Sequence, residues 1–96
     1  MHATIRTYSD PELADLLTSR KDEVEQLIGA VPGIHSYTLL RTPEGVAAVA
    51  VGDDEAATEA SRAAAADFLR REAPNAPPPV ITGGTVIVQL GAGVRA

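Results

Sequence analysis

The chain has 96 residues, enough for one domain and too few for two. Eight basic against thirteen acidic residues give a net charge of −5, which argues against nucleic acids and anionic membranes as partners, because both require clustered cations. The lack of cysteine excludes disulfides and thiolate chemistry, and the lack of a signal-peptide-like or membrane-spanning apolar run predicts a cytoplasmic protein.

The first third of the chain predicts a strand followed by a helix. Residues 2–8 alternate and contain residue types that favour strands. One face of this strand carries Ala3 and Ile5, and the other carries Thr4, Arg6 and Tyr8. Asp10 followed by Pro11 is typical of a helix start. An apolar stripe from Leu13 to Ile28 then predicts one helix, which Gly29 ends.

The middle of the chain predicts a β-hairpin. Residues 34–42 form its first strand, and the turn residues at 42–45 lead into residues 46–51. The run 46–51 has no polar residue, which is typical of a central strand buried on both faces. One face of the first hairpin strand carries Ile34, Ser36, Thr38 and Leu40, and the other carries His35, Tyr37, Leu39 and Arg41.

The last part predicts a second helix and a closing strand. Residues 55–72 are rich in alanine, and Asp53 or Asp54 is available as the N-cap. The expected inner stripe of this helix comprises Ala57, Ala60, Ala64, Ala65, Phe68 and Leu69. Residues 73–79, with four prolines, predict a stiff surface connector. Val80-Ile81 and Thr85–Leu90 predict a last strand interrupted at Gly83-Gly84, and 91–96 predict a frayed tail.

This order predicts one α+β domain over residues 1–96 with the ferredoxin-like βαββαβ arrangement. We expect a four-stranded antiparallel sheet with two helices on one face. Alternation does not decide which faces of the first two strands meet the helices. The uncovered face would be closed most simply by a second copy, so we expect a homodimer that forms a dimeric α/β barrel.

Four segments resemble the dimeric α/β barrel superfamily, in particular its antibiotic-biosynthesis-monooxygenase-like (ABM-like) group. They are Ile5-Arg6-Thr7-Tyr8, Pro32-Gly33-Ile34 with Ser36-Tyr37, the alanine-rich second helix, and the proline-rich approach to Gly84-Thr85-Val86-Ile87-Val88. The group includes cofactor-free oxygenases of aromatic polyketides and quinols, polyketide cyclases, haem-degrading enzymes and proteins without an assigned activity. The resemblance implies the fold and the homodimer more directly than it implies an activity.

The site residues of that group are only partly present. Its enzymes commonly use an Asn, a Trp and often a His around the substrate, but this chain has no Trp, and Asn75 in the connector is its one Asn. The second helix, where the haem-degrading relatives place their iron ligand, has no His. We therefore expect no cofactor.

The candidate site residues come from the first two strands. His35 and Tyr37 are the candidate catalytic residues, as a base and a phenol donor, and Arg6, Tyr8 and Arg41 join them as candidate ligand-binding residues. The alternative is that an edge strand exposes His35 and Arg41, while Arg6 forms an ion pair at a dimer seam.

No metal site is expected from this sequence. His2 and His35 lack acidic neighbours at ligand spacing, and the Asp53-Asp54-Glu55 run is typical of a helix cap rather than a calcium loop.

Three functions remain, of which the third is a regulatory small-molecule-binding module of the same fold. The first is a homodimeric ABM-like barrel of unassigned activity that binds a small apolar or aromatic ligand or a partner protein. The second is a cofactor-independent monooxygenase or cyclase acting on an aromatic polyketide-like or quinol-like substrate. The enzyme hypothesis predicts an enclosed cavity of roughly 300 Å³ or more, with the candidate side chains pointing into it.

Overall fold

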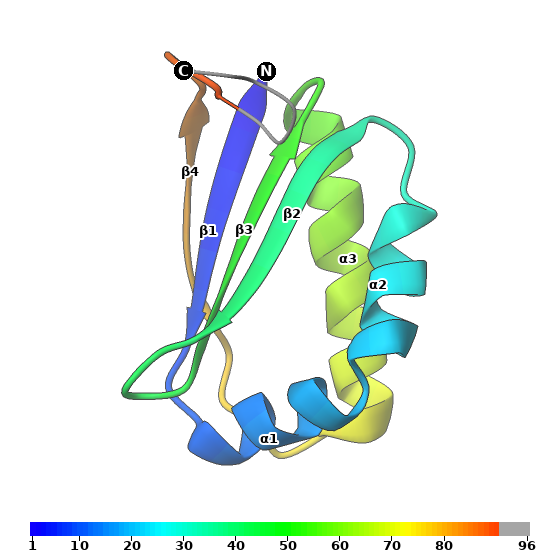
Figure 1. Cartoon of the computed structure of the whole chain (residues 1–96), viewed down its shortest axis with the longest axis vertical. Helices are drawn as coiled ribbons and strands as arrows, with labels where there is room; N and C mark the ends of the chain where they lie inside the picture. The colour runs from blue at the N-terminus through cyan, green and yellow to red at the C-terminus, as the bar shows by residue number, and fades with distance from the viewer. Residues whose placement is uncertain (91–96) are drawn as a thin grey trace.

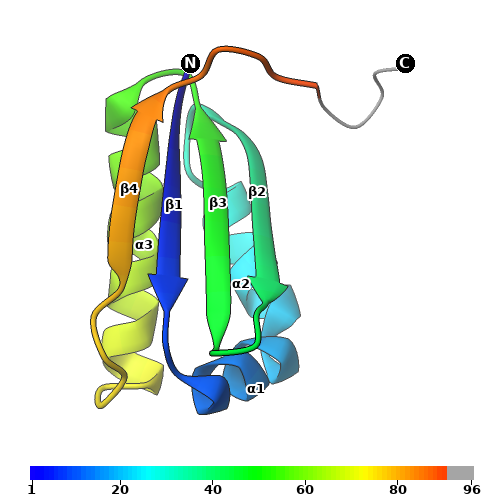
Figure 2. The same cartoon turned by 90° about the vertical axis from the view of Figure 1, so that its left-hand side faces the viewer.

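A computed structural model describes residues 1–90, so the predicted tail at 91–96 lies outside the described residues. The strands are β1 (His2–Tyr8), β2 (Ile34–Arg41), β3 (Val46–Gly52) and β4 (Val80–Thr85), and the helices are α1 (Pro11–Ser19), α2 (Lys21–Gly29) and α3 (Glu55–Glu72). The strands form one antiparallel sheet in the order β2-β3-β1-β4. The helices lie on one face of the sheet, and Figure 2 shows the other face uncovered. This arrangement confirms the predicted ferredoxin-like fold, with β3 as a central strand.

The prediction of a single helix over residues 13–28 is wrong, because α1 and α2 are separated by a break at Arg20 (φ −114°, ψ 22°). The backbone N–H of Arg20 still bonds to the carbonyls of Leu16 and Leu17, at 3.1 and 3.3 Å. Its guanidinium reaches Glu72 at the end of α3, with an N–O distance of 2.5 Å. The break lets α1 lie across the end of the sheet while α2 runs beside α3 (Figure 1).

The last strand also differs from its prediction. β4 runs without interruption through Gly83 and Gly84, both of which pair with β1. A Cβ atom on Gly83 would lie 3.2 Å from the ring of His2 and 3.4 Å from the methyl group of Thr4. Glycine at position 83 therefore leaves room for these two β1 side chains rather than bending the strand.

Residues 86–90, which we call the C-terminal arm, do not continue the strand to Leu90 as predicted. The arm keeps one hydrogen bond to the sheet end, from the N–H of Val86 to the carbonyl of Met1 at 3.0 Å. Beyond it the side chains have little to pack on, and Ile87 is 95% exposed. Figure 2 shows the arm crossing the end of the sheet toward β2 and passing beyond it.

The core lies between the sheet and the helices. On β1 it is the Thr4, Arg6 and Tyr8 face that is buried there, while Ile5 faces the uncovered side and is 48% exposed. The largest apolar members of the core come from all three helices and from β1 and β3. They are Tyr8, Leu13, Leu17, Val24, Ile28, Val46 and Phe68.

The inner face of α3 is more polar than predicted. Thr58 and Ser61 are buried on it, whereas Ala60 is exposed. Their hydroxyl groups are satisfied within the helix, because Thr58 donates to the carbonyl of Glu55 and Ser61 to that of Thr58. None of the helices in residues 1–90 combines the length and the apolar character that crossing a bilayer requires.

Candidate functional site

Arg6 is the most unusual residue of the interior. It points from β1 toward the helices and is 0% exposed. Its Nη2 donates to the phenolic oxygen of Tyr37 at 3.5 Å, and its guanidinium carbon lies 5.8 Å from the centre of the Tyr37 ring. The Nε and Nη1 atoms have no acceptor within residues 1–90, and no carboxylate of that part of the chain forms an ion pair with Arg6. A permanent positive charge is thus held in the interior with an incomplete set of partners.

Tyr8 is the second polar group of this region. Burial raises the pKa of its phenol above the ordinary value of 10.0, although the positive charge of Arg6 opposes that increase. The neighbouring Tyr37 raises the pKa further, and the charge of Arg62 lowers it. Tyr8 is therefore a neutral phenol at physiological pH, able to donate a hydrogen bond.

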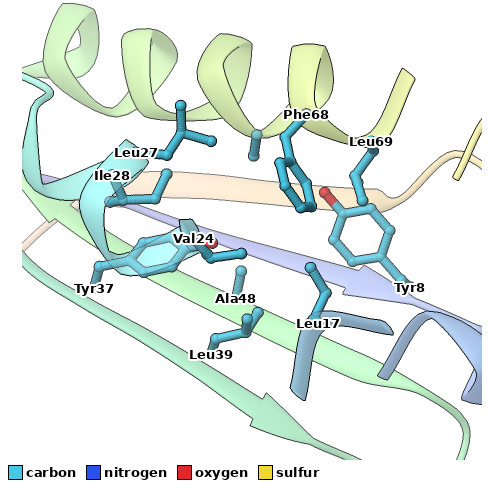
Figure 3. Close-up of a pocket in the computed structure, with 11 residues that line it drawn as sticks. Tyr8, Leu17, Val24, Leu27, Ile28, Tyr37, Leu39, Ala48, Phe68 and Leu69 are labelled. Carbon is cyan, nitrogen blue, oxygen red and sulfur yellow. The ribbon is translucent and has the colours of Figure 1, made fainter. Parts of the chain in front are cut away.

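A small internal cavity connects the two tyrosines. Its volume is about 20 Å³, which is room for about one water molecule. Figure 3 shows Tyr8 and Tyr37 at opposite ends, with aliphatic side chains such as Leu17 and Val24 between them. The enclosed cavity of 300 Å³ or more that the enzyme hypothesis predicts is not present within residues 1–90 in this conformation.

A larger open groove lies beside this cavity. It has a volume of about 460 Å³ and runs between β2 and the helices α1 and α2; we call it the β2 groove. Leu17, Val24, Tyr37 and Leu39 line both the groove and the internal cavity, so the two spaces are adjacent. The walls are mostly apolar, and Lys21, Glu25 and Arg41 are its charged residues.

The other two predicted site residues lie away from Arg6. The pairing of β2 with β3 shifts between Ile34 and Ser36, and this irregularity leaves His35 exposed, in an ion pair with Asp53. Arg41 is exposed beside the groove. Its Nη1 lies 2.9 Å from the Asp15 carboxylate and its Nη2 lies 3.1 Å from the Thr18 hydroxyl.

The structure thus places Arg6, Tyr8 and Tyr37 in one interior region, whereas Arg41 shares only the wall of the β2 groove with Tyr37, and His35 lines a separate surface pocket beside Tyr37. The exposure of His35 and Arg41 matches the alternative in which an edge strand simply presents them to solvent. Arg6 lies beneath the helices and not on the uncovered sheet face, which would form the seam of a barrel dimer. Within residues 1–90, no group of three or more acidic or histidine side chains is arranged to hold a metal ion.

Sequence reasoning missed the helical wall of the groove. Leu17 and Val24 belong to the apolar stripe of the first helical segment, and their spacing of seven residues placed them on one face. That spacing is the signal that could have identified them, but it is the same as that of ordinary core residues. The partners of the exposed groups, Asp53 and Asp15, had no recognisable signal in the sequence.

No family model and no curated protein matches the sequence. Solved structures do match. A protein of unknown function from Nitrosomonas europaea superposes with a TM-score of 0.71 at 21% identity, covering 96% of this chain and 94% of that one. A protein from Chloroflexus aurantiacus described as an antibiotic biosynthesis monooxygenase gives a TM-score of 0.68 at 18% identity, with coverages of 94% and 96%.

A third structure is a monooxygenase from the gene ActVA-Orf6 of Streptomyces coelicolor in complex with nanaomycin D. Its TM-score is 0.64 at 22% identity, with coverages of 93% of this chain and 88% of that one. Likeness at these identities concerns the fold and not the activity. The chain has the ferredoxin-like fold of the ABM-like proteins.

Proposed function

We propose that this chain is a homodimeric ABM-like protein that binds a small apolar or aromatic ligand in the β2 groove. The observation that carries the proposal is the groove itself, whose apolar walls lead from solvent to Tyr37 and the adjoining internal cavity. Sites for small molecules are typically concave and apolar with a few polar groups that orient the ligand. The complex of the Streptomyces coelicolor monooxygenase with nanaomycin D supports a small-molecule ligand for this fold.

Binding is favoured over catalysis by the positions of the titratable side chains. A general base must come within hydrogen-bond reach of the proton that it removes. His35 is exposed and paired with Asp53, and it does not line the groove. The charged residues that do line the groove lie among apolar side chains, and one of them, Arg41, is paired with Asp15.

The homodimer is supported by two surfaces with unpartnered apolar side chains. The uncovered sheet face presents Ile5 from β1 together with Val49 from β3 and Leu40 from β2. The C-terminal arm adds Ile87, Val88 and Leu90, which are among the most exposed large apolar residues of the described chain. A second copy covers both surfaces if the sheets pack face to face and the arms cross to the partner.

A cofactor-independent monooxygenase or cyclase acting on an aromatic polyketide-like or quinol-like substrate is the second candidate function. Two of the similar solved structures are described as monooxygenases, which favours it. In that case Tyr37 and Arg6 would be the groups that meet the substrate. Turnover of a quinol with consumption of oxygen by the purified protein would decide for this candidate.

The binding proposal is tested with a neutral aromatic probe, N-phenyl-1-naphthylamine, whose fluorescence rises in apolar surroundings. Lys21→Trp places a large side chain in the groove, and Ala63→Trp places the same side chain on an exposed position of α3 outside it. We expect probe binding by the natural protein and by Ala63→Trp, and its loss in Lys21→Trp. Equal binding by both variants would show that the groove is not the site.

The homodimer is tested by native mass spectrometry of the natural protein and of a variant with Ile5→Asp on the sheet face. We expect twice the chain mass for the natural protein and a monomer for the variant, because a buried unpaired carboxylate opposes association. A natural protein that stays monomeric across the accessible concentration range would overturn the dimer. A bound small molecule in a gently purified sample would add its mass and identify the ligand class.

A further inference from the structure

We propose that the ligand of the β2 groove is an organic acid: a planar apolar body carrying one anionic oxygen group, which the buried guanidinium of Arg6 binds. The inference rests on the proposed function, because it names the chemical class of the ligand for the same groove. Carboxylates and acidic phenols or enols share this chemistry.

The hydrogen bonding of Arg6 is incomplete. Its side chain is fully buried and permanently charged, yet its Nε and Nη1 lack acceptors within residues 1–90. Buried charges in proteins are almost always paired, because removing an ion from water without compensation is strongly unfavourable. Glu59 senses the charge of Arg6, but it already accepts hydrogen bonds from Arg62 at 2.6 to 3.0 Å. Arg6 therefore has the donors for an anion, and within residues 1–90 no carboxylate is paired with it.

Tyr37 lies between the β2 groove and Arg6. Tyr37 lines the groove and the internal cavity, and it also contacts Arg6 through both its ring and its hydroxyl group. The hydrogen bond between Tyr37 and Arg6, at 3.5 Å, is longer than ordinary N–H···O bonds and is therefore weak. A charged acceptor forms shorter and stronger bonds with a guanidinium than a neutral phenol does, so it can replace this contact. Tyr37 is thus the residue that a ligand meets before Arg6.

The surroundings of the two tyrosines are mostly apolar. Apolar side chains, including Val24, Leu39 and Phe68, surround the cavity between the tyrosines and keep the local dielectric constant low. Tyr8 stands at the other end of this cavity and senses the charge of Arg6. Arg6 lines neither the cavity nor the groove but lies behind Tyr37, so the Tyr37 side chain has to turn aside for an anionic group to reach the guanidinium. The apolar surroundings then favour a ligand with a single anionic end and a hydrophobic remainder.

The test compares two probes that share one aromatic body. These are 8-anilinonaphthalene-1-sulfonate, which is anionic, and N-phenyl-1-naphthylamine, which lacks the sulfonate and is neutral. We expect the natural protein to bind the anionic probe about tenfold more tightly or better, as a charge-assisted hydrogen bond implies. Arg6→Met should abolish this preference, so that the ratio of the two affinities, measured within each protein, falls to about one.

Arg41→Met is the matched control, because it removes the same charge from the edge of the groove and leaves Arg6 in place. This control should keep most of the preference. Two results would overturn the inference but leave the proposed function standing. One is equal affinities for the two probes in the natural protein, and the other is a preference that is lost in Arg41→Met and kept in Arg6→Met. Binding of neither probe would overturn both.

If the Arg6→Met variant does not fold, a measurement on the natural protein alone still tests the inference. Salt screens exposed charges far more than buried ones, with a screening length of about 3 Å at about 1 M. A preference created by Arg6 should therefore persist at about 1 M sodium chloride. A preference that disappears there would assign the effect to the exposed Lys21 and Arg41 and would contradict the role of Arg6.

Discussion

The guanidinium of Arg6 lies against the ring of Tyr37, with 5.8 Å between its central carbon and the ring centre. A cation–π contact is worth about 2 kcal/mol or more when its groups are removed from water. Arg6 is fully buried, and Tyr37 is partly buried. The contact offsets only part of the free energy needed to bury an arginine that has no carboxylate partner within residues 1–90. Burying Arg6 against Tyr37 therefore lowers the stability of the fold at the place where the groove adjoins the core.

Replacing Arg6 by Met should leave the protein as stable or make it more stable, by about 1 to 4 kcal/mol. The substitution keeps an unbranched side chain of similar length and removes the buried charge. Stabilisation that accompanies loss of binding is typical of functional positions. Urea unfolding followed by circular dichroism measures the change. A loss of several kcal/mol would instead show that Arg6 is a structural residue of the core.

Replacing Gly45 by Ala should destabilise the protein by about 1 to 3 kcal/mol or more. A Cβ atom there would lie 2.6 Å from the backbone nitrogen of Asp10 and closer still to the carbonyl oxygen of Tyr8. The hairpin turn would have to move away from the segment that joins β1 to α1. Gly29→Ala is the control, because within residues 1–90 nothing beyond its chain neighbours and its own helix backbone lies within 4 Å of its Cβ position, and it should change the stability by less than about 1 kcal/mol. Similar midpoints for both variants in urea would refute the close approach.

Replacing Phe68 by Ala should lower the free energy of unfolding by about 3 to 5 kcal/mol. Phe68 is 2% exposed, packs in the core between α3 and the sheet, and is contacted at its ring by Arg20 and Arg71. Phe68→Leu is the matched control and should lose much less, because it retains most of the apolar volume. If both variants unfold at the same urea concentration, the ring is not a major element of the core.

Local signals in the sequence predicted much of the fold. Asp10 is the N-cap of α1 as expected, since its carboxylate accepts from the N–H groups of Glu12 at 3.0 Å and Leu13 at 3.4 Å. Asp54 caps α3 in the same way, through the N–H of Ala57 at 2.9 Å. Residues 46–51 lie in β3, a central strand of the sheet, as their lack of a polar face indicated. Caps and periodicity depend on neighbouring residues, so one sequence suffices to identify them.

Features set by distant contacts were not predictable. The apolar stripe continues through the break at Arg20, and only the partner Glu72, far along the chain, shows why the corner is stable. The irregular pairing beside Ile34 changes the direction of His35, so the alternation that grouped His35 with Tyr37 does not hold. The residue types of the C-terminal arm favour a strand, but a strand also needs a neighbour, which the single chain does not supply.

The candidate residues stay a prediction, but the structure shows where each of them lies. The guanidinium of Arg6 lies against Tyr37, whereas Tyr8 and Tyr37 lie at opposite ends of the internal cavity. Their burial beneath the helices was not predictable, because a strand face bearing Thr, Arg and Tyr is normally the solvent face. The groove depends on the angle between α1 and α2, which follows from the break at Arg20 and not from any local pattern.

The stability of the protein should fall as the pH rises above 10.0, because the pKa of Tyr8 is raised in the folded state, mainly by burial. Above that pH the unfolded chain loses the phenolic proton while the folded chain retains it, so ionisation favours unfolding. Below pH 10.0 both states are protonated at Tyr8, and this group makes no contribution to the pH dependence.

Tyr37→Phe leaves Tyr8 as the one tyrosine of the chain, so the ultraviolet absorbance of tyrosinate then reports Tyr8 alone. In this background the absorbance should titrate above pH 10.0. Adding Arg6→Met should raise the pKa of Tyr8 further, because the positive charge that favours the phenolate is removed. Titration of Tyr8 below pH 10.0, or a downward shift when Arg6 is replaced, would show that the two side chains do not share a buried environment.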